Sequence, residues 1–279
     1  MATVLITGCS SGFGKLAALH FARKGDTVYA SMRNTKKGAE LEQARDDENL
    51  KIELLQLDVT DEASVKKAVA HVIDAAGQID VLVNNAGIGA HGPIEETEDD
   101  EAKEIFETNF FGVLRVIRAA LPHMREKKSG MIVNVSSLAG RVSPPFDGIY
   151  AASKYALEAV TEALNYEVHP FGIRVALVEP GGFETNIGNT LRIPRGYGEG
   201  SPYLALDQSF EKALTKLPGR DEESDPQTVA EAIYNAVHDE EPKLRYLVGK
   251  DAEMIGALRK QMDDEQFEQT IRQALDFWD

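Results

Sequence analysis

A tyrosine, a lysine and a serine in the middle of the chain have the types and spacing of an acid–base site. Tyr150 and Lys154 are four residues apart, so a helix over this segment places both on one face. A phenol has a pKa near ~10, and a nearby ammonium favours the phenolate and lowers that pKa. The pair is therefore predicted to exchange a proton with a substrate oxygen near neutral pH. Ser137, 13 residues before Tyr150, is a candidate to hydrogen-bond the same oxygen. The alternative is an amphipathic helix with a half-buried tyrosine and a surface lysine.

Length and composition restrict what such a site serves. The chain has 279 residues, enough for one large α/β domain with a buried core. Its net charge of −16 argues against nucleic-acid binding, because no net basic field is present to displace counterions from phosphates. Cys9 is the one cysteine, which excludes an internal disulfide and favours a reducing compartment. The N-terminus shows no basic leader, and its apolar run is too short for a signal or membrane segment. We therefore expect a cytoplasmic protein with no membrane partner.

A glycine-rich turn near the N-terminus is a candidate phosphate site. An apolar strand is predicted over residues 3–8 and a helix over residues 15–24, with the turn between them. Glycines let the backbone approach an anion, and the free N–H groups of a helix N-terminus bind it. The alternative is an ordinary tight turn between a strand and a helix. The candidate residues of this turn are Gly8, Ser10, Ser11, Gly12, Phe13 and Gly14.

The end of the second predicted strand bears on the choice of dinucleotide. In dinucleotide-binding folds an acidic residue here binds the adenosine ribose of NAD, whereas an arginine accommodates the extra phosphate of NADP. No Asp or Glu lies between Thr27 and Lys37, and Arg33 follows the strand. A guanidinium suits phosphate geometry, and Ser11 could add a hydroxyl. The pattern therefore favours NADP(H) over NAD(H), unless Arg33 is only a solvated side chain.

Seven short apolar segments alternate with helical patterns along the chain. This order predicts a Rossmann-like doubly wound α/β fold with a seven-stranded parallel sheet, in one domain over residues 1–279. Asp58 and Val59 end the third strand, and Asn84 and Asn85 follow the fourth, where such folds bind ligands. The two asparagines could equally make a turn. The predicted strands cover residues 3–8, 27–32, 52–59, 80–83, 131–135, 174–178 and 244–249.

The helix before the fifth strand carries a polar residue among apolar ones. Thr97 and Asp100 resemble a capping box, which predicts a helix from there to about Leu121, before Pro122. Asn109 lies within this helix, where a buried amide is costly unless it has hydrogen-bond partners. It is therefore expected either to bond locally or to be placed for function.

Two segments near the C-terminus have less regular patterns. Residues 186–223 are rich in glycine and proline around a short helix near residues 203–217, and form either a flap over the substrate or a surface excursion. A C-terminal helical extension is predicted over about residues 251–279. Its apolar stripe is expected to be a packing surface, either within the chain or at a subunit contact. The stripe consists of Phe267, Ile271, Leu275 and Trp278.

Taken together, these motifs resemble those of the short-chain dehydrogenase/reductase family. They occur in the family's order over roughly residues 3–250, and the strings VYASMR at residues 28–33 and LLQLDV at 54–59 lean toward its 17β-hydroxysteroid- and retinol-dehydrogenase-like branch. The resemblance rests on TGCSSGFG at residues 7–14, NNAG at 84–87, Asn109, Ser137, YAASK at 150–154 and PGGFET at 180–185.

The resemblance implies a role for each of these residues. Tyr150 would be the general acid and base, with Lys154 lowering its pKa and holding the nicotinamide ribose. Ser137 would polarise the substrate carbonyl, and Asn109 would keep a water that links Lys154 to solvent. The implied cofactor site also contains Asp58 at the adenine, Val59, Asn85, Ala86 and Gly87 along the dinucleotide, and Phe183 and Thr185 at the nicotinamide amide. No metal is implied.

The expected function is NADP(H)-dependent hydride transfer between nicotinamide and a small-molecule carbonyl/alcohol pair, in a homodimer or homotetramer. A lipophilic ketone, aldehyde, steroid or retinoid-like compound is favoured if certain apolar residues line the substrate site rather than the core. The alternatives are an NADP(H)-binding sensor without turnover, an NAD-preferring alcohol dehydrogenase, and a sugar-nucleotide epimerase or dehydratase. The candidate wall residues are Phe146, Ile149, Phe183, Leu191, Tyr203 and Leu204.

Overall fold

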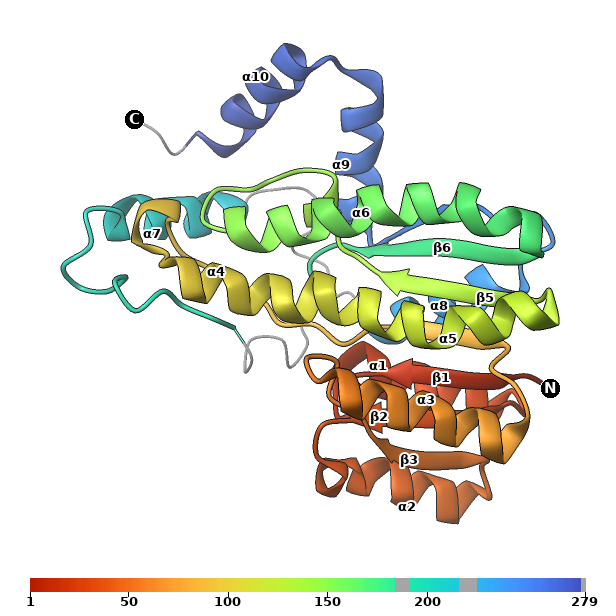
Figure 1. The fold of residues 1–279 in the computed structure, drawn as a ribbon. Coiled ribbons are helices and arrows are strands. Elements are labelled where there is room, and N and C mark those ends of the chain that lie inside the picture. The colour runs from red at the N-terminus through yellow and green to blue at the C-terminus, as the bar shows by residue number, and fades with distance from the viewer. Residues whose placement is uncertain (184–190, 216–224, 277–279) are drawn as a thin grey trace.

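Seven parallel strands form one sheet in the computed structural model, which describes residues 1–183, 191–215 and 225–276 (Figure 1). Their order across the sheet is β3-β2-β1-β4-β5-β6-β7, and every neighbouring pair is parallel. The predicted doubly wound α/β fold is therefore confirmed. The strands are β1 (Thr3–Thr7), β2 (Thr27–Met32), β3 (Ile52–Gln56), β4 (Val81–Asn84), β5 (Gly130–Val135), β6 (Ile173–Pro180) and β7 (Arg245–Val248).

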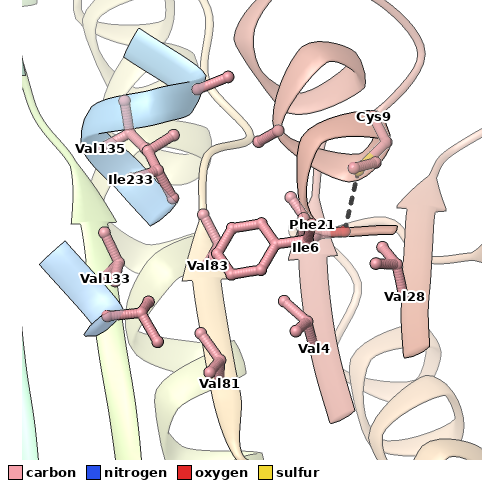
Figure 2. Packing of buried hydrophobic residues seen from close by; sticks show 14 of the residues in the cluster. Val4, Ile6, Cys9, Phe21, Val28, Val81, Val83, Val133, Val135 and Ile233 are labelled. Carbon is pink, nitrogen blue, oxygen red and sulfur yellow. Dashed lines mark hydrogen bonds between the residues drawn. The ribbon is translucent and has the colours of Figure 1, made fainter. Parts of the chain in front are cut away.

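Helices cover both faces of this sheet, which is why the strands are apolar at consecutive positions. On one face Val4 and Ile6 of β1 pack in a core with Phe21 of α1 (Gly12–Arg23) and Ile233 of α8 (Gln227–His238). Figure 2 shows the side chains of Phe21 and Ile233 beside the valines of β1, β4 and β5. On the other face Leu5 packs with side chains of α3 (Glu62–Ala76), α5 (Val113–Lys127) and α6 (Gly148–Val168). Alternate side chains of one strand thus enter different cores.

The strand order reverses between β1 and β4, and this reversal places the candidate site. From β1 the chain proceeds to β2 and β3 on one side, and from β4 to β5, β6 and β7 on the other. Loops that leave the carboxyl ends of β1 and β4 therefore part in opposite directions and leave a crevice between them. The strand arrows point toward the end of the molecule that carries α7 (Leu204–Leu214) and α10 (Asp264–Leu275) (Figure 1).

Several predicted boundaries differ from the structure. Helix α1 begins at Gly12 instead of residue 15, and α6 begins at Gly148, two residues before Tyr150. The strand predicted to reach Val59 ends at Gln56. Helix α2 (Ala39–Glu48) has no apolar stripe that would have predicted it, since Leu41 is its one buried side chain.

The predicted capping box at Thr97 is wrong. Glu98 and Glu101 form the box of α4 (Asp99–Phe106), while the Thr97 hydroxyl donates to the carbonyl of Pro93 at 2.9 Å. A π-helical segment, Glu107–Gly112, joins α4 to α5. Helix α5 accommodates Pro122 within its length and therefore passes the predicted end near Leu121.

The C-terminal residues pack on their own chain. After α9 (Lys250–Gln261), helix α10 lies beside α7, and Leu275 and Ile271 contact the buried ring of Phe210. The stripe is a packing surface as predicted, and the contacts of Ile271 and Leu275 with Phe210 are within the chain. Trp278 lies outside the described residues. No helix in the described part of the chain has the length and apolar character to cross a bilayer.

Candidate active site

The glycine-rich turn after β1 has the geometry of an anion cradle. Gly8 has a φ of +76°, and a Cβ there would lie 2.8 Å from the Cα of Ala86. A Cβ on Gly14 would lie 2.5 Å from the carbonyl oxygen of Gly8. Ser11 caps α1 in an extended conformation with no side-chain hydrogen bond to the helix, and the first turn has no acidic residue. The N–H groups of this helix end therefore remain available to an anion, which fits a dinucleotide phosphate.

Asn85 and Thr7 fix the loop after β4 to this cradle. The Asn85 side-chain amide donates to the carbonyls of Thr7 and Gly8 at 2.9 and 3.2 Å. In return, the Thr7 hydroxyl accepts from the backbone N–H groups of Asn85 and Ala86, each at 3.0 Å. Asn85 thus joins the two loops that border the crevice. A residue that only made a turn would not need these bonds.

A first cavity lies along these loops and contains most of the predicted cofactor residues. Arg33 is exposed at its rim, and within the described residues no hydrogen bond or ion pair occupies its guanidinium. Asp58 lies further along, where its carboxylate accepts from the N–H and hydroxyl of Thr60 at 3.0 and 2.8 Å. The predicted residues that line this cavity are Gly8, Ser10, Ser11, Gly12, Phe13, Arg33, Asp58, Val59, Asn85, Ala86, Gly87, Tyr150 and Lys154.

Two predicted cofactor residues lie elsewhere, and a third is not among the described residues. Gly14 is behind the turn, packed against Gly8, and Phe183 lines a second cavity. Thr185 lies outside the described residues. Sequence analysis missed further lining residues because single apolar or hydroxyl side chains carry no distinctive spacing; they are Met32, Leu57, Thr60, Ile88, Thr108, Val135 and Ser136.

Lys154 is buried beside Tyr150. Its side chain is 6% exposed, its Nζ donates to the carbonyl of Val135 at 3.0 Å, and the same nitrogen lies 5.7 Å from the centre of the Tyr150 ring. Burial lowers the pKa of Lys154 to about 8, while the carboxylate of Glu158 one turn away opposes that shift. The two predicted partners are therefore adjacent, with the ammonium poorly solvated.

The pKa of Tyr150 differs from the prediction. Burial raises the pKa of Tyr150 to about 12, hydrogen bonding to Ser137 acts in the opposite direction, and the Asp147 carboxylate adds to the rise. The expected net lowering of this pKa is thus wrong for the protein alone, because desolvation of the phenolate is the largest effect on it. Ser137 lines the second cavity together with Tyr150, and its hydroxyl accepts from the N–H of Ala139 at 3.1 Å. Its bond to a substrate oxygen stays a prediction.

Asn109 lies in the π-helical segment and bonds locally. Its Oδ1 accepts from the N–H of Ile88 at 2.9 Å, and its Nδ2 donates to the carbonyl of Ile88 at 2.9 Å and to the Ser153 hydroxyl at 3.1 Å. These bonds join the loop after β4 to α6. Gly87 keeps this region close, since a Cβ there would lie 3.3 Å from Asn109 Oδ1 and 3.9 Å from Lys154 Nζ. The water relay stays a prediction.

The second cavity opens on the other side of Tyr150. It has a volume of about 370 Å³ and shares Phe13, Ser136 and Tyr150 with the first cavity. Ser137 and Leu138 line it near the tyrosine, and its far wall comes from α7, α9 and α10. That wall is apolar and consists of Phe210, Leu214, Ile255, Phe267, Ile271 and Leu275.

The predicted wall residues divide between cavities. Phe183 and Leu191 line the second cavity, whereas Phe146 and Ile149 line a neighbouring third one. The other two predicted wall residues line none of the three cavities, and the Tyr203 hydroxyl instead donates to Glu95. The helical spacing of apolar side chains in residues 267–275 was the sequence signal for part of the second cavity's wall. That spacing does not reveal which surface the apolar face covers.

A buried pair of carboxyl groups lies behind Ser136 and was not predicted. Glu158 and Glu179 are 5% and 0% exposed, and Arg245 bridges them at 3.1 and 3.0 Å. Burial raises the pKa of both carboxyls, that of Glu179 to about 8, and repulsion by Glu158 adds to the rise at Glu179.

Comparison with known proteins identifies the family. Residues 2–195 match the family described as short chain dehydrogenase. The chain belongs to the short-chain dehydrogenase family. It is thus an NAD(P)-dependent oxidoreductase acting on CH–OH groups, and the sequence-level resemblance is confirmed.

Relatives of this short-chain dehydrogenase cover nearly its whole length. A 3-ketodihydrosphingosine reductase of Bacteroides thetaiotaomicron is 38% identical, over 92% of this chain and 91% of the relative. The 17-beta-hydroxysteroid dehydrogenase type 1 of Homo sapiens is 34% identical, over 94% of this chain and 81% of the relative. A solved short-chain dehydrogenase of Streptomyces avermitilis is 37% identical, with a TM-score of 0.80 over 98% of this chain and 99% of that chain.

Proposed function

We propose that this short-chain dehydrogenase is an NADP(H)-dependent oxidoreductase for lipophilic carbonyl/alcohol substrates. The observation that carries the proposal is the position of Tyr150, which lines both the first cavity, beside the glycine-rich turn, and the apolar second cavity. A group bound in one cavity and a group bound in the other meet at this hydroxyl. Bound nicotinamide dinucleotide would supply or accept the hydride, and the protein would supply position and protons.

The proton chemistry follows from the state of Tyr150. With a pKa of about 12, Tyr150 carries its proton at neutral pH and can donate it to a carbonyl oxygen that is being reduced. Ser137, which lines the second cavity together with this tyrosine, would donate to the same oxygen and polarise the carbonyl. Lys154 would stabilise the tyrosinate electrostatically and bind the nicotinamide ribose. Asn109 would hold the loop after β4 against α6.

The preference for NADP(H) over NAD(H) rests on Arg33. Its guanidinium is exposed at the rim of the first cavity, on the same rim as Ser11 and the helix N-terminus. The end of β2 offers no carboxylate to hold an adenosine ribose, and a second phosphate would find a planar cation there. The remaining predicted residues would bind the dinucleotide along the first cavity, with Phe183 and Thr185 at its nicotinamide end.

The apolar wall of the second cavity supports a lipophilic substrate. A pocket of this size takes a drug-sized molecule, and its aliphatic and aromatic lining favours a hydrocarbon body next to the reacting carbonyl. Two relatives are named for 3-ketodihydrosphingosine and for a 17-beta-hydroxysteroid, so these compounds belong in the substrate panel. Part of the wall comes from the predicted flap and the C-terminal extension, which we assign to one catalytic domain with the rest of the chain.

The test is NADPH oxidation against aldehydes, ketones, quinones, ketosteroids and 3-ketodihydrosphingosine, with Tyr150→Phe beside the wild type. We expect turnover of lipophilic members by the wild type, at least about 100-fold slower turnover by the variant, and similar NADPH affinity for both. Wild-type-like turnover by Tyr150→Phe would refute the acid–base role. Tight NADPH binding with no turnover of any compound would favour the sensor without turnover.

The surroundings of the protein form a separate part of the proposal. We assign it to the cytoplasm as a homodimer or homotetramer, in keeping with its single buried cysteine and its family. Light scattering after size-exclusion chromatography gives the mass directly, and a monomer at micromolar concentration would refute the assembly.

A further inference from the structure

His91 lies between two carboxylates in the lining of the third cavity, beside the second, and no catalytic motif includes it. Its Nδ1 is 2.9 Å from Asp147 Oδ1, and its Nε2 is 3.1 and 3.2 Å from the two oxygens of Asp207. A neutral imidazole has one N–H, so it can donate to one of these carboxylates but not to both. With both carboxylates ionised, both nitrogens must carry a proton, which makes His91 an imidazolium.

The two carboxylates belong to the two walls of the active site. Asp147 directly precedes α6, and its carbonyl accepts the first backbone bond of that helix, from Ala151 at 2.8 Å. Asp207 lies in α7, 7% exposed, and also accepts from the Tyr197 hydroxyl. Helix α7 supplies Phe210 to the substrate cavity. His91 thus joins the first turn of the helix that carries Tyr150 to the helix that forms the cavity wall.

A strained residue lies between these walls. Phe146 has a φ of +65°, and in the described part of the chain it is the one non-glycine residue with positive φ that does not cap the end of a helix. Such a conformation is unfavourable for an aromatic residue and persists only when its surroundings hold it. The Phe146 ring lies 6.0 Å from the ring of His91 and 5.9 Å from that of Phe210, and its carbonyl accepts from Gly92 at 2.7 Å.

We propose that His91 is a positioning residue that clamps α7 and Phe146 against the start of α6 and thereby sets substrate chain-length specificity. The inference rests on the proposed function, because it assumes that the second cavity holds the substrate. Long substrates contact the α7 wall, and short ones end before it. Loss of the clamp would let Phe210 move and would weaken binding of long substrates while leaving proton transfer at Tyr150 intact.

The clamp also predicts a dependence on pH. The groups that face His91 are Asp147, directly before α6, and Asp207 and Glu211 from α7. The Tyr197 hydroxyl donates to Asp207, and the charge of Glu96 acts on Tyr197. Hydrogen bonding to Asp147, opposed by burial, raises the pKa of His91 to about 9. The clamp is therefore complete at neutral pH and is lost as pH rises through about 9, when one nitrogen becomes an acceptor facing a carboxylate.

The test compares decanal and butanal as substrates of the wild type, His91→Gln and Asp207→Asn. We expect KM for decanal to rise at least about tenfold in both variants, with KM for butanal, kcat and NADPH affinity within about twofold of the wild type. His71→Gln is the matched control, since His71 also pairs with a carboxylate, Glu53 at 2.6 Å, but on an exposed surface. Equal changes in KM for the two aldehydes, or none, would overturn the proposal. The result is expressed as the ratio of KM for decanal to KM for butanal. Because the titration of Lys154 affects both substrates, its effect cancels in this ratio.

A measurement without turnover separates this inference from the proposed function. In NMR titration of the wild type, the ring of His91, assigned by its absence in His91→Gln, is expected to titrate near pH 9. Asp207→Asn should lower that midpoint. A midpoint near the ordinary value of ~6.5 would overturn the clamp, even if the enzyme reduces every carbonyl in the panel. The expected midpoint with no turnover by the wild type would instead uphold the ionic contact of His91 but reject both the proposed function and the specificity role that rests on it.

Discussion

Replacement of Arg33 by aspartate gives the most direct measure of cofactor choice. Arg33 is exposed, and no described residue holds its guanidinium in an ion pair, so its removal breaks no contact of the fold. A hydrogen bond to a charged group contributes about 1.5–3 kcal/mol, which corresponds to about 10- to 150-fold in affinity. The aspartate adds repulsion toward a phosphate and can accept hydrogen bonds from the ribose of NADH. We therefore expect NADPH affinity to fall by at least about 10- to 150-fold, and NADH affinity to stay or improve.

The assay is equilibrium binding of NADPH and NADH, followed by nicotinamide fluorescence at low and high salt. Lys36→Asp is the control, because it makes the same change in charge three residues away, outside the lining of the first cavity. A contact with phosphate predicts a large loss for Arg33→Asp and a small, salt-sensitive one for Lys36→Asp. Equal weakening of both dinucleotides, or equal effects of both substitutions, would refute the phosphate role.

Two further substitutions test the cradle and the buried carboxyl pair. Gly14→Ala places a Cβ 2.4 Å from Asn85 Nδ2, so we expect dinucleotide affinity to fall by roughly 5- to 150-fold, the equivalent of a 1–3 kcal/mol overpacking cost. Gly198→Ala meets no atom within 4 Å and should bind as the wild type does; the same affinity in both variants would exclude the tight cradle. Burial raises the pKa of Glu179 to about 8, above the ordinary range of a glutamate. The folded wild type therefore loses stability as pH rises from that ordinary range through 8, whereas a variant with neutral Gln at this position does not. The Tm of Glu179→Gln relative to the wild type should therefore increase between pH 5 and pH 8, by about 2–4 °C for each ~1 kcal/mol, and a constant difference would contradict the buried charge.

The sheet and the dinucleotide crevice were predictable because their determinants are local. Each strand is a short apolar run, since helices cover both faces, and the motifs directly follow the strand ends. The backbone need at Gly8 is likewise local, because its positive φ and close approach to Ala86 leave no room for a side chain. Such requirements appear in the sequence as residue types at fixed positions.

The rest of the site depends on contacts between distant residues. His91 and Asp207 are 116 positions apart, and nothing near either one indicates the other. The spacing of Phe267, Ile271 and Leu275 identifies a buried helix face but does not tell whether a cavity, a core or a second chain buries it. The shift in the pKa of Tyr150 also escaped prediction, because it arises from the solvent excluded by all its neighbours together.

The two cavities that meet at Tyr150 draw on different parts of the polypeptide. The first is lined by residues between Gly8 and Lys154, whereas the far wall of the second comes from α7, α9 and α10. If the two cavities hold cofactor and substrate as proposed, their recognition can diverge separately in evolution, with the proposed acid–base residues unchanged at their boundary. A chimera that takes its C-terminal third from a relative should acquire that relative's substrate range and keep its own dinucleotide.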